Sequence, residues 1–135
     1  MKRIVFVLIL TGVLMAFVFN LSSCEKERTS EPKVAFIAGS TYISSDDTLF
    51  RGTIFNVKVN ASKVGLSDLL TSGKITRSVN GGADSTMLEM NFFTQNFSQY
   101  YSYTAGDSGN VEKYTFTFGT QSGLYASSSI SITVN

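Results

Sequence analysis

The chain has 135 residues, with 11 basic and 10 acidic side chains, a single cysteine, and no histidine or tryptophan. A net charge of +1 is not the basic excess typical of nucleic-acid binding. A single cysteine excludes an internal disulfide, and the lack of histidine removes the usual general base near neutral pH. These features favour a protein without catalytic function, held together by its hydrophobic core.

The first 23 residues have the pattern of a secretory signal peptide. Lys2 and Arg3 precede an uncharged, mostly apolar run over residues 4–19. This run is shorter than the ~20 residues that span a bilayer comfortably, so a retained transmembrane anchor is the less favoured alternative. Small residues and the cysteine follow at residues 21–24, in the order Leu-Ser-Ser-Cys.

This order of basic head, apolar middle, small residues and cysteine resembles the lipobox of bacterial lipoproteins. The resemblance implies cleavage between Ser23 and Cys24, attachment of a diacylglycerol to the Cys24 sulfur, and three acyl chains in all, such as palmitate, on the mature cysteine. Because stable anchoring takes about two lipid signals, the acyl chains on Cys24 would suffice to hold the protein on a membrane. We therefore expect a lipoprotein of the cell envelope, anchored in the outer membrane, and the sequence leaves open which face it occupies.

Residues 24–32 are predicted to be a flexible tether. The segment is charged and almost free of apolar side chains, so it buries too little surface to fold. Glu25, Lys26 and Glu27 approximately resemble the export signal that follows the lipidated cysteine in Bacteroidetes-type lipoproteins. The alternative is a generic solvated linker, and the sequence does not decide between the two.

From residue 33 onward, apolar and polar residues alternate with a period of two. Phe55, Val57 and Val59 illustrate the pattern, which indicates half-buried strands. Asn80-Gly81-Gly82 is the sharpest hairpin signal, since these residues tolerate the positive φ of a tight turn. A single helical turn is expected at residues 67–70, where Ser67 is a capping residue. The predicted strands are 33–38 with a possible continuation at 41–43, 53–61, 73–79, 85–91, 96–104, 111–119 and 124–134.

About seven short strands in residues 33–135 predict a single antiparallel β-sandwich with Greek-key connections. The motifs at residues 52–59, 76–82 and 114–118, with the closing strand to Val134, resemble the small immunoglobulin-like domains of Bacteroidetes lipoproteins. The chain departs from the antibody pattern, because Phe116 stands where such domains place their second cysteine. Aromatic packing is expected in place of the disulfide.

No catalytic or metal-binding pattern is present. The sequence has no Gly-x-Ser-x-Gly motif, and no base is evident to activate a serine. Asp46, Asp47 and Asp107 are the candidate oxygen ligands for a metal, but without Asp-x-Asp-x-Asp spacing they are better explained as turn residues. We expect no enzyme activity, no metal and no cofactor.

Aromatic residues at 92–103 are the main candidates for ligand binding. Tyr100 falls on the polar phase of its strand, and one of Phe92 and Phe93 must point outward, so these three are the candidate site. Phe97, Tyr101 and Tyr103 are expected in the core.

Two functions from different classes follow. The first is a binding or adhesion module for a glycan or a protein. The second is a structural or accessory subunit of an envelope complex, joined through an exposed edge strand such as 124–134.

Overall fold

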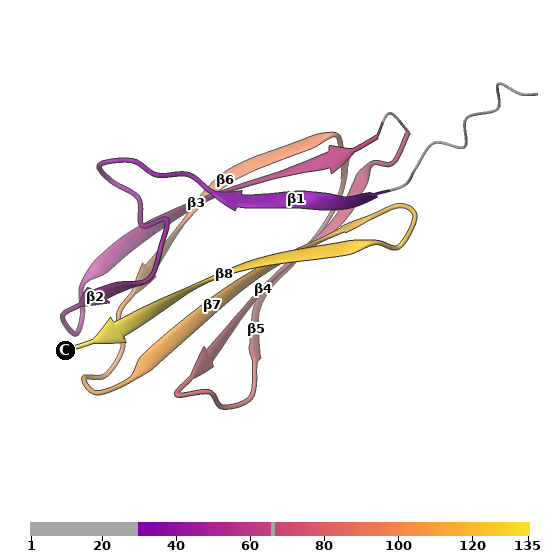
Figure 1. Cartoon of the computed structure of the whole chain (residues 1–135). Helices are drawn as coiled ribbons and strands as arrows, with labels where there is room; N and C mark the ends of the chain where they lie inside the picture. Colours follow the sequence, from indigo (N-terminus) through magenta and orange to yellow (C-terminus); the bar gives the residue numbers. More distant parts are fainter. Residues whose placement is uncertain (1–29, 66) are drawn as a thin grey trace, which may run out of the picture.

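Residues 30–65 and 67–135 are described by a computed structural model, and they form two β-sheets packed face to face (Figure 1). The smaller sheet has the order β1-β3-β6 and the larger has the order β2-β8-β7-β4-β5. All neighbouring strands are antiparallel except β2 and β8, which are parallel. The strands are β1 Ser30–Phe36, β2 Asp47–Leu49, β3 Ile54–Val64, β4 Leu70–Val79, β5 Ser85–Thr94, β6 Asn96–Thr104, β7 Val111–Thr120 and β8 Tyr125–Val134.

The chain is therefore an immunoglobulin-like all-β sandwich, as predicted. It passes from β3 in the smaller sheet to the β4–β5 hairpin in the larger sheet, and then returns to β6 beside β3. All seven predicted strands are present: β6 has the predicted bounds, and the other six are shifted at one or both ends. The expected continuation at residues 41–43 is only an isolated bridge between Gly39 and Tyr42. Within the described residues, no helix is long and apolar enough to cross a membrane.

Two features near the N-terminal end differ from the prediction. β1 begins at Ser30, so residues 30–32 of the expected tether belong to the sandwich, and Pro32 is buried. The short strand β2 falls where only a connecting piece was expected, because alternation is not visible over three residues. Its pairing with the end of β8 is what makes it a strand. Ser23 and Cys24 lie outside the described residues.

The predicted helical turn at residues 67–70 is wrong. Leu70 already belongs to β4, and the buried Asp68 points to a remote turn instead of capping a helix. Its carboxylate accepts hydrogen bonds from the Ser122 hydroxyl at 2.6 Å and from the Ser122 N–H at 3.0 Å. Asp68 thus fixes the turn between β7 and β8 onto the start of β4.

The Asp68 contact should make the fold sensitive to acid. The Ser122 hydroxyl bond lowers the pKa of Asp68 below its ordinary value of 3.8, because it favours the carboxylate in the folded state. The stabilisation is fully present above that ordinary value and is lost as pH falls through the lowered folded pKa. Between about pH 5 and pH 3, urea unfolding should show a smaller loss of stability for Asp68→Asn than for the wild type. Equal losses would contradict this role.

The Asn80-Gly81-Gly82 turn is confirmed. Asn80 and Gly81 have φ values of 51° and 71°, and the Gly82 N–H donates to the Val79 carbonyl at 2.9 Å. Positive φ at both central residues matches the twist of the flanking strands. The Asn80 side chain also accepts from the Val111 N–H at 2.8 Å, which fastens the hairpin to the start of β7.

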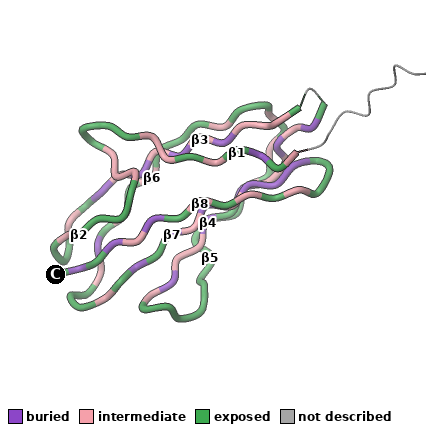
Figure 2. The backbone as a smooth tube through the Cα atoms, viewed as in Figure 1, coloured by how far each residue is buried: buried purple, intermediate pink, exposed green. Residues whose placement is uncertain are grey.

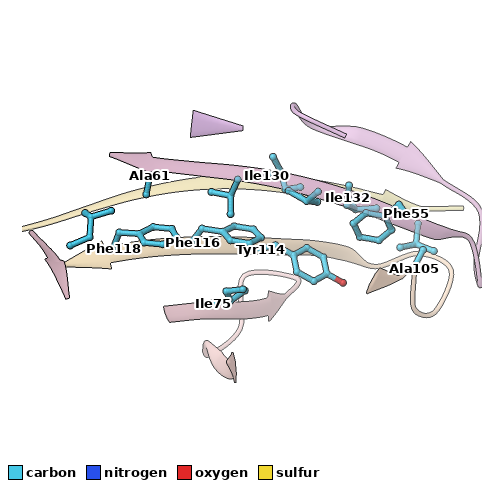
Figure 3. Packing of buried hydrophobic residues seen from close by; sticks show 13 residues of the cluster. Phe55, Ala61, Ile75, Ala105, Tyr114, Phe116, Phe118, Ile130 and Ile132 are labelled. Carbon is cyan, nitrogen blue, oxygen red and sulfur yellow. The ribbon is translucent and has the colours of Figure 1, made fainter. Parts of the chain in front are cut away.

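Buried residues occur on strands of both sheets (Figure 2). They form a core between the sheets that is rich in aromatic side chains. Phe118, Phe116 and Tyr114 follow one another along β7 (Figure 3). From the smaller sheet, Phe36 packs edge-on against Phe116 with ring centroids 5.4 Å apart, and Phe55 packs in the same way against Tyr114 at 5.7 Å. The expected aromatic packing at Phe116 is thus confirmed. The core prediction for three β6 residues also holds, since each is half-buried against this cluster: Phe97, Tyr101 and Tyr103.

One end of the core holds a buried ion pair that the sequence did not predict. Glu112 has no exposed surface, and its carboxylate pairs with the Arg77 guanidinium across β7 and β4. The same carboxylate accepts from the Tyr114 hydroxyl at 2.9 Å and the Gly106 N–H at 3.2 Å. Burial raises the pKa of Tyr114, so its hydroxyl keeps the proton that it donates.

Candidate functional site

A small groove of about 210 Å³ lies on the outer face of the five-stranded sheet. It crosses four neighbouring strands, so its walls are held by the backbone ladders rather than by loops. Drug-sized ligands occupy pockets of about 300 Å³ and more, so this groove suits a single ring. Its lining residues are Ser72, Gly73, Lys74, Glu89, Met90, Asn91, Thr117 and Tyr125.

The groove depends on a glycine beside its aromatic residue. Tyr125 at the start of β8 is paired with Gly119 in β7. A Cβ atom at Gly119 would lie 2.5 Å from Cε1 of Tyr125 and 2.6 Å from the Ser72 hydroxyl. The tyrosine ring therefore lies across the backbone of β7 toward β4, in space that only glycine leaves open. Tyr125 keeps 60% of its surface exposed.

Polar groups form the other side of the groove. Lys74 of β4 and Glu89 of β5 are joined by an ion pair of 3.1 Å, and both side chains are largely exposed. Asn91 adds an amide beside them, while the Thr117 hydroxyl shares a 2.8 Å hydrogen bond with Ser127. Ammonium, carboxylate, amide and hydroxyl groups thus surround one aromatic ring, and together they offer both donors and acceptors.

Tyr100 is exposed as predicted but lies elsewhere. It keeps 63% of its surface exposed on the outer face of the three-stranded sheet, where it is paired with Lys58. Hydrogen-bonded pairs lie on both sides of it, Ser98 with Asn60 and Ser102 with Asn56. A second hollow of about 340 Å³ lies near the start of β3, and Tyr100 does not line it.

The phenylalanine pair divides between the core and the surface. Phe92 is half-buried and stacks on Phe97, with centroids 5.1 Å apart, so its assignment to a surface site is wrong. Phe93 keeps 70% of its surface exposed, which confirms that one of the two points outward. Because Tyr100 and Phe93 belong to different sheets, they form no common platform.

The three candidate metal ligands serve separate local roles. Asp46 accepts from the Ser131 N–H at 2.8 Å, and Asp47 accepts from the neighbouring Thr48 N–H at 2.7 Å. Asp107 forms an exposed ion pair of 3.2 Å with Arg51. Across residues 30–65 and 67–135, no three acidic, histidine or cysteine side chains gather where they could hold a metal ion.

The prediction that 124–134 is an exposed edge strand is only partly correct, because the short strand β2 pairs with residues 132–134 alone and no described strand pairs with that side of residues 125–131. β8 is paired with β7 along its length and with β2 at residues 132–134. The strands at the edges of that sheet are β2 and β5.

The sequence contained a signal for one residue of the groove. Tyr125 falls in the polar phase of its strand, with Ser127 and Ser129, so an exposed aromatic residue was readable there. The contribution of Gly119 was not readable, because it depends on the register of the β7–β8 hairpin.

Comparisons with known proteins show no matching family model and no matching curated protein. Among solved structures, the chain is similar to Spo0M, a sporulation control protein from Bacillus subtilis, with 16% identity and a TM-score of 0.47 over 78% of this chain and 50% of that one. The chain thus spans half the length of Spo0M. It is also similar to the CARDB domain of the PF1109 protein from Pyrococcus furiosus, solved in complex with di-metal ions, with 12% identity and a TM-score of 0.43 over 80% of this chain and 99% of that domain. Likenesses this distant carry no information on ligand or activity.

Proposed function

We propose that the chain is a lipid-anchored, non-catalytic binding module of the bacterial cell envelope that holds a carbohydrate ring in the groove beside Tyr125. The observation that carries the proposal is the exposed Tyr125 ring lying over Gly119 in a hollow lined with polar side chains. The lipobox pattern ending at Cys24 supports the anchor.

The chemistry of the groove suits a sugar better than an apolar ligand. A tyrosine ring offers an apolar face to the C–H groups of a pyranose and a polar tip at its edge. Asn91, Lys74 and Glu89 offer donors and acceptors to the ring hydroxyls. Because these groups stand on a paired sheet, little ordering is needed when the ligand binds.

The proposal predicts that Tyr125→Ala weakens binding on a carbohydrate array by about 10-fold or more, since a central aromatic contact is lost. Tyr100→Ala is the matched control, because it makes the same change at a similarly exposed tyrosine on the other sheet. It should leave binding unchanged. If Tyr100→Ala abolishes binding while Tyr125→Ala retains it, the site lies on the three-stranded sheet instead.

Gly119→Ala tests the geometry without removing the tyrosine. The added methyl group collides with the ends of two side chains, Tyr125 and Ser72, and therefore moves both while the backbone stays in place. We expect carbohydrate binding to fall with little change in the urea midpoint. Unchanged binding would show that the ring position is not part of the site.

The anchor is tested separately by labelling cells with radioactive palmitate. The wild-type chain should incorporate label, and Cys24→Ala should incorporate none because it removes the only thiol. Protease treatment of intact cells then decides which membrane face the chain occupies. If the chain binds external glycans, it should be digested while a periplasmic control protein survives. A wild-type chain without label would refute the lipoprotein part of the proposal and leave the groove untouched.

A further inference from the structure

The edge strand β5 exposes unusually apolar surface. Figure 1 shows it as the outermost strand of the larger sheet, and in the described residues no strand pairs with its free side. Met87, Leu88 and Phe93 keep 45%, 38% and 70% of their surface exposed. Edge strands are normally protected by lysine, proline, inward-pointing charges or β-bulges. β5 has no lysine or proline, and its one charge, Glu89, is paired with Lys74.

We propose that β5 pairs with β5 of a second copy of this chain, antiparallel about a two-fold axis at Met90. The sequence of the strand carries this inference, because its polarity is symmetric about that residue. Met87-Leu88 and Phe92-Phe93 are apolar pairs at equal distances from Met90, and Glu89 and Asn91 are the polar residues between them. A two-fold axis places the same patch on both copies, which requires such self-complementarity.

In this register each residue meets a suitable partner. Leu88 faces Phe92 of the second copy, Met87 faces its Phe93, and Glu89 faces its Asn91. The exposed apolar surface is thus covered on both sides of the axis. No like charges oppose one another, and the Asn91 amide can donate to the carboxylate of Glu89.

Neighbouring registers are worse. An axis between two residues, for example between Glu89 and Met90, would place an outer-face side chain opposite an inner-face one. Met90 belongs to the inner face, because its sulfur accepts from the Tyr101 hydroxyl inside the sandwich. An axis at Glu89 would oppose that carboxylate to its own copy, and like charges directly opposite are unfavourable. An axis at Asn91 would set Glu89 against Phe93.

The bulges of β5 are compatible with the pairing. Its register with β4 shifts on either side of Leu88–Asn91, so a short regular stretch is flanked by two irregular ends. The Met90 axis pairs residues 89–91 of the two copies within this stretch, and it brings the irregular end of each copy against the opposite end of the other. The pairing of the two β5 strands also joins the five-stranded sheets of both copies. It places the two grooves, each lined by Glu89 and Asn91, near the axis. The dimer does not depend on which ligand the groove binds.

The test is sedimentation equilibrium of the full chain in a density-matched detergent. The wild type should dimerise. Asn91→Glu places two pairs of carboxylates opposite one another in each dimer and should raise the dissociation constant by between about 2-fold and 30-fold. Asn91→Lys at the same position should lower it, because each lysine then faces Glu89 of the second copy.

Gln99→Glu is the control, since it adds the same charge to an exposed residue in the edge strand of the other sheet. It should behave as the wild type. A wild type that stays monomeric, or a dimer that the two Asn91 variants shift in the same direction, overturns the proposal. The first result would leave the edge to a strand from a different protein.

Discussion

Phe116→Ala should lower the free energy of unfolding by about 3–5 kcal/mol, as is typical of large aromatic residues removed from a core. Phe116 has no exposed surface and lies at the centre of β7. Its ring centroid lies 5.4 Å from that of Phe36 in β1 and 6.0 Å from that of Tyr101 in β6. The cavity left by the substitution would therefore lie between the two sheets. Without a disulfide, no covalent link compensates for this loss.

Urea unfolding measures the effect, with Phe50→Ala as the matched control. Phe50 keeps 75% of its surface exposed, so its replacement should change stability by about 0.5 kcal/mol or less. A loss at Phe116 no larger than that at Phe50 would mean that aromatic packing does not take the place of the disulfide.

Glu112→Ala should cost about 3 kcal/mol or more, the range for breaking a buried ion pair by removing one partner. The change leaves the Arg77 guanidinium without its carboxylate at a position where only 34% of its side chain is exposed. It also removes the acceptor of the Tyr114 hydroxyl and the Gly106 N–H. An unsatisfied buried polar group costs more than the hydrogen bond itself contributed.

Asp107→Ala is the comparison for this effect. Asp107 is also an acidic residue paired with an arginine, Arg51, but the two side chains are 75% and 70% exposed. Surface ion pairs contribute about 0–1 kcal/mol, so this variant should remain close to the wild type in urea. Similar losses in the two variants would contradict the buried network as a distinct source of stability.

The strands were predictable because one face of each sheet is buried and the other meets solvent. In β3 and β7 this alternation is nearly complete, and both strands were placed to within a few residues. β2 was missed because three residues show no period and only the contact with β8 defines them. Asp68 was misassigned because a helix cap and an acceptor for a remote turn use the same residue type.

The buried ion pair shows a different limit. Glu112 falls in the same phase as Tyr114 and Phe116, so a charge on the inner face of the strand was visible in the sequence. Its partner Arg77 comes from β4, 35 positions away, and only the sheet order brings them together. A sequence pattern shows which face a residue occupies, but not which strand lies next to it.

The same limit explains the outcome for the candidate site. The exposure of Tyr100 and of one phenylalanine in the pair was predicted correctly from phase. The separation of Phe93 from Tyr100 was not predicted. The chain crosses from one sheet to the other between β5 and β6, so these two residues lie on different outer faces. The groove at Tyr125 needs the pairing with Gly119, which is fixed by the hairpin register.

The central claim is that the groove beside Tyr125 binds a carbohydrate, and a nuclear magnetic resonance titration of the isotope-labelled chain tests it most directly. The ligand would be the glycan that binds most tightly on the array. We predict that the backbone amide signals of Ser72, Asn91 and Tyr125 shift with ligand concentration, while those of Ser98 and Tyr100 stay in place. Shifts confined to the three-stranded sheet, or no shift with any carbohydrate, would contradict the account.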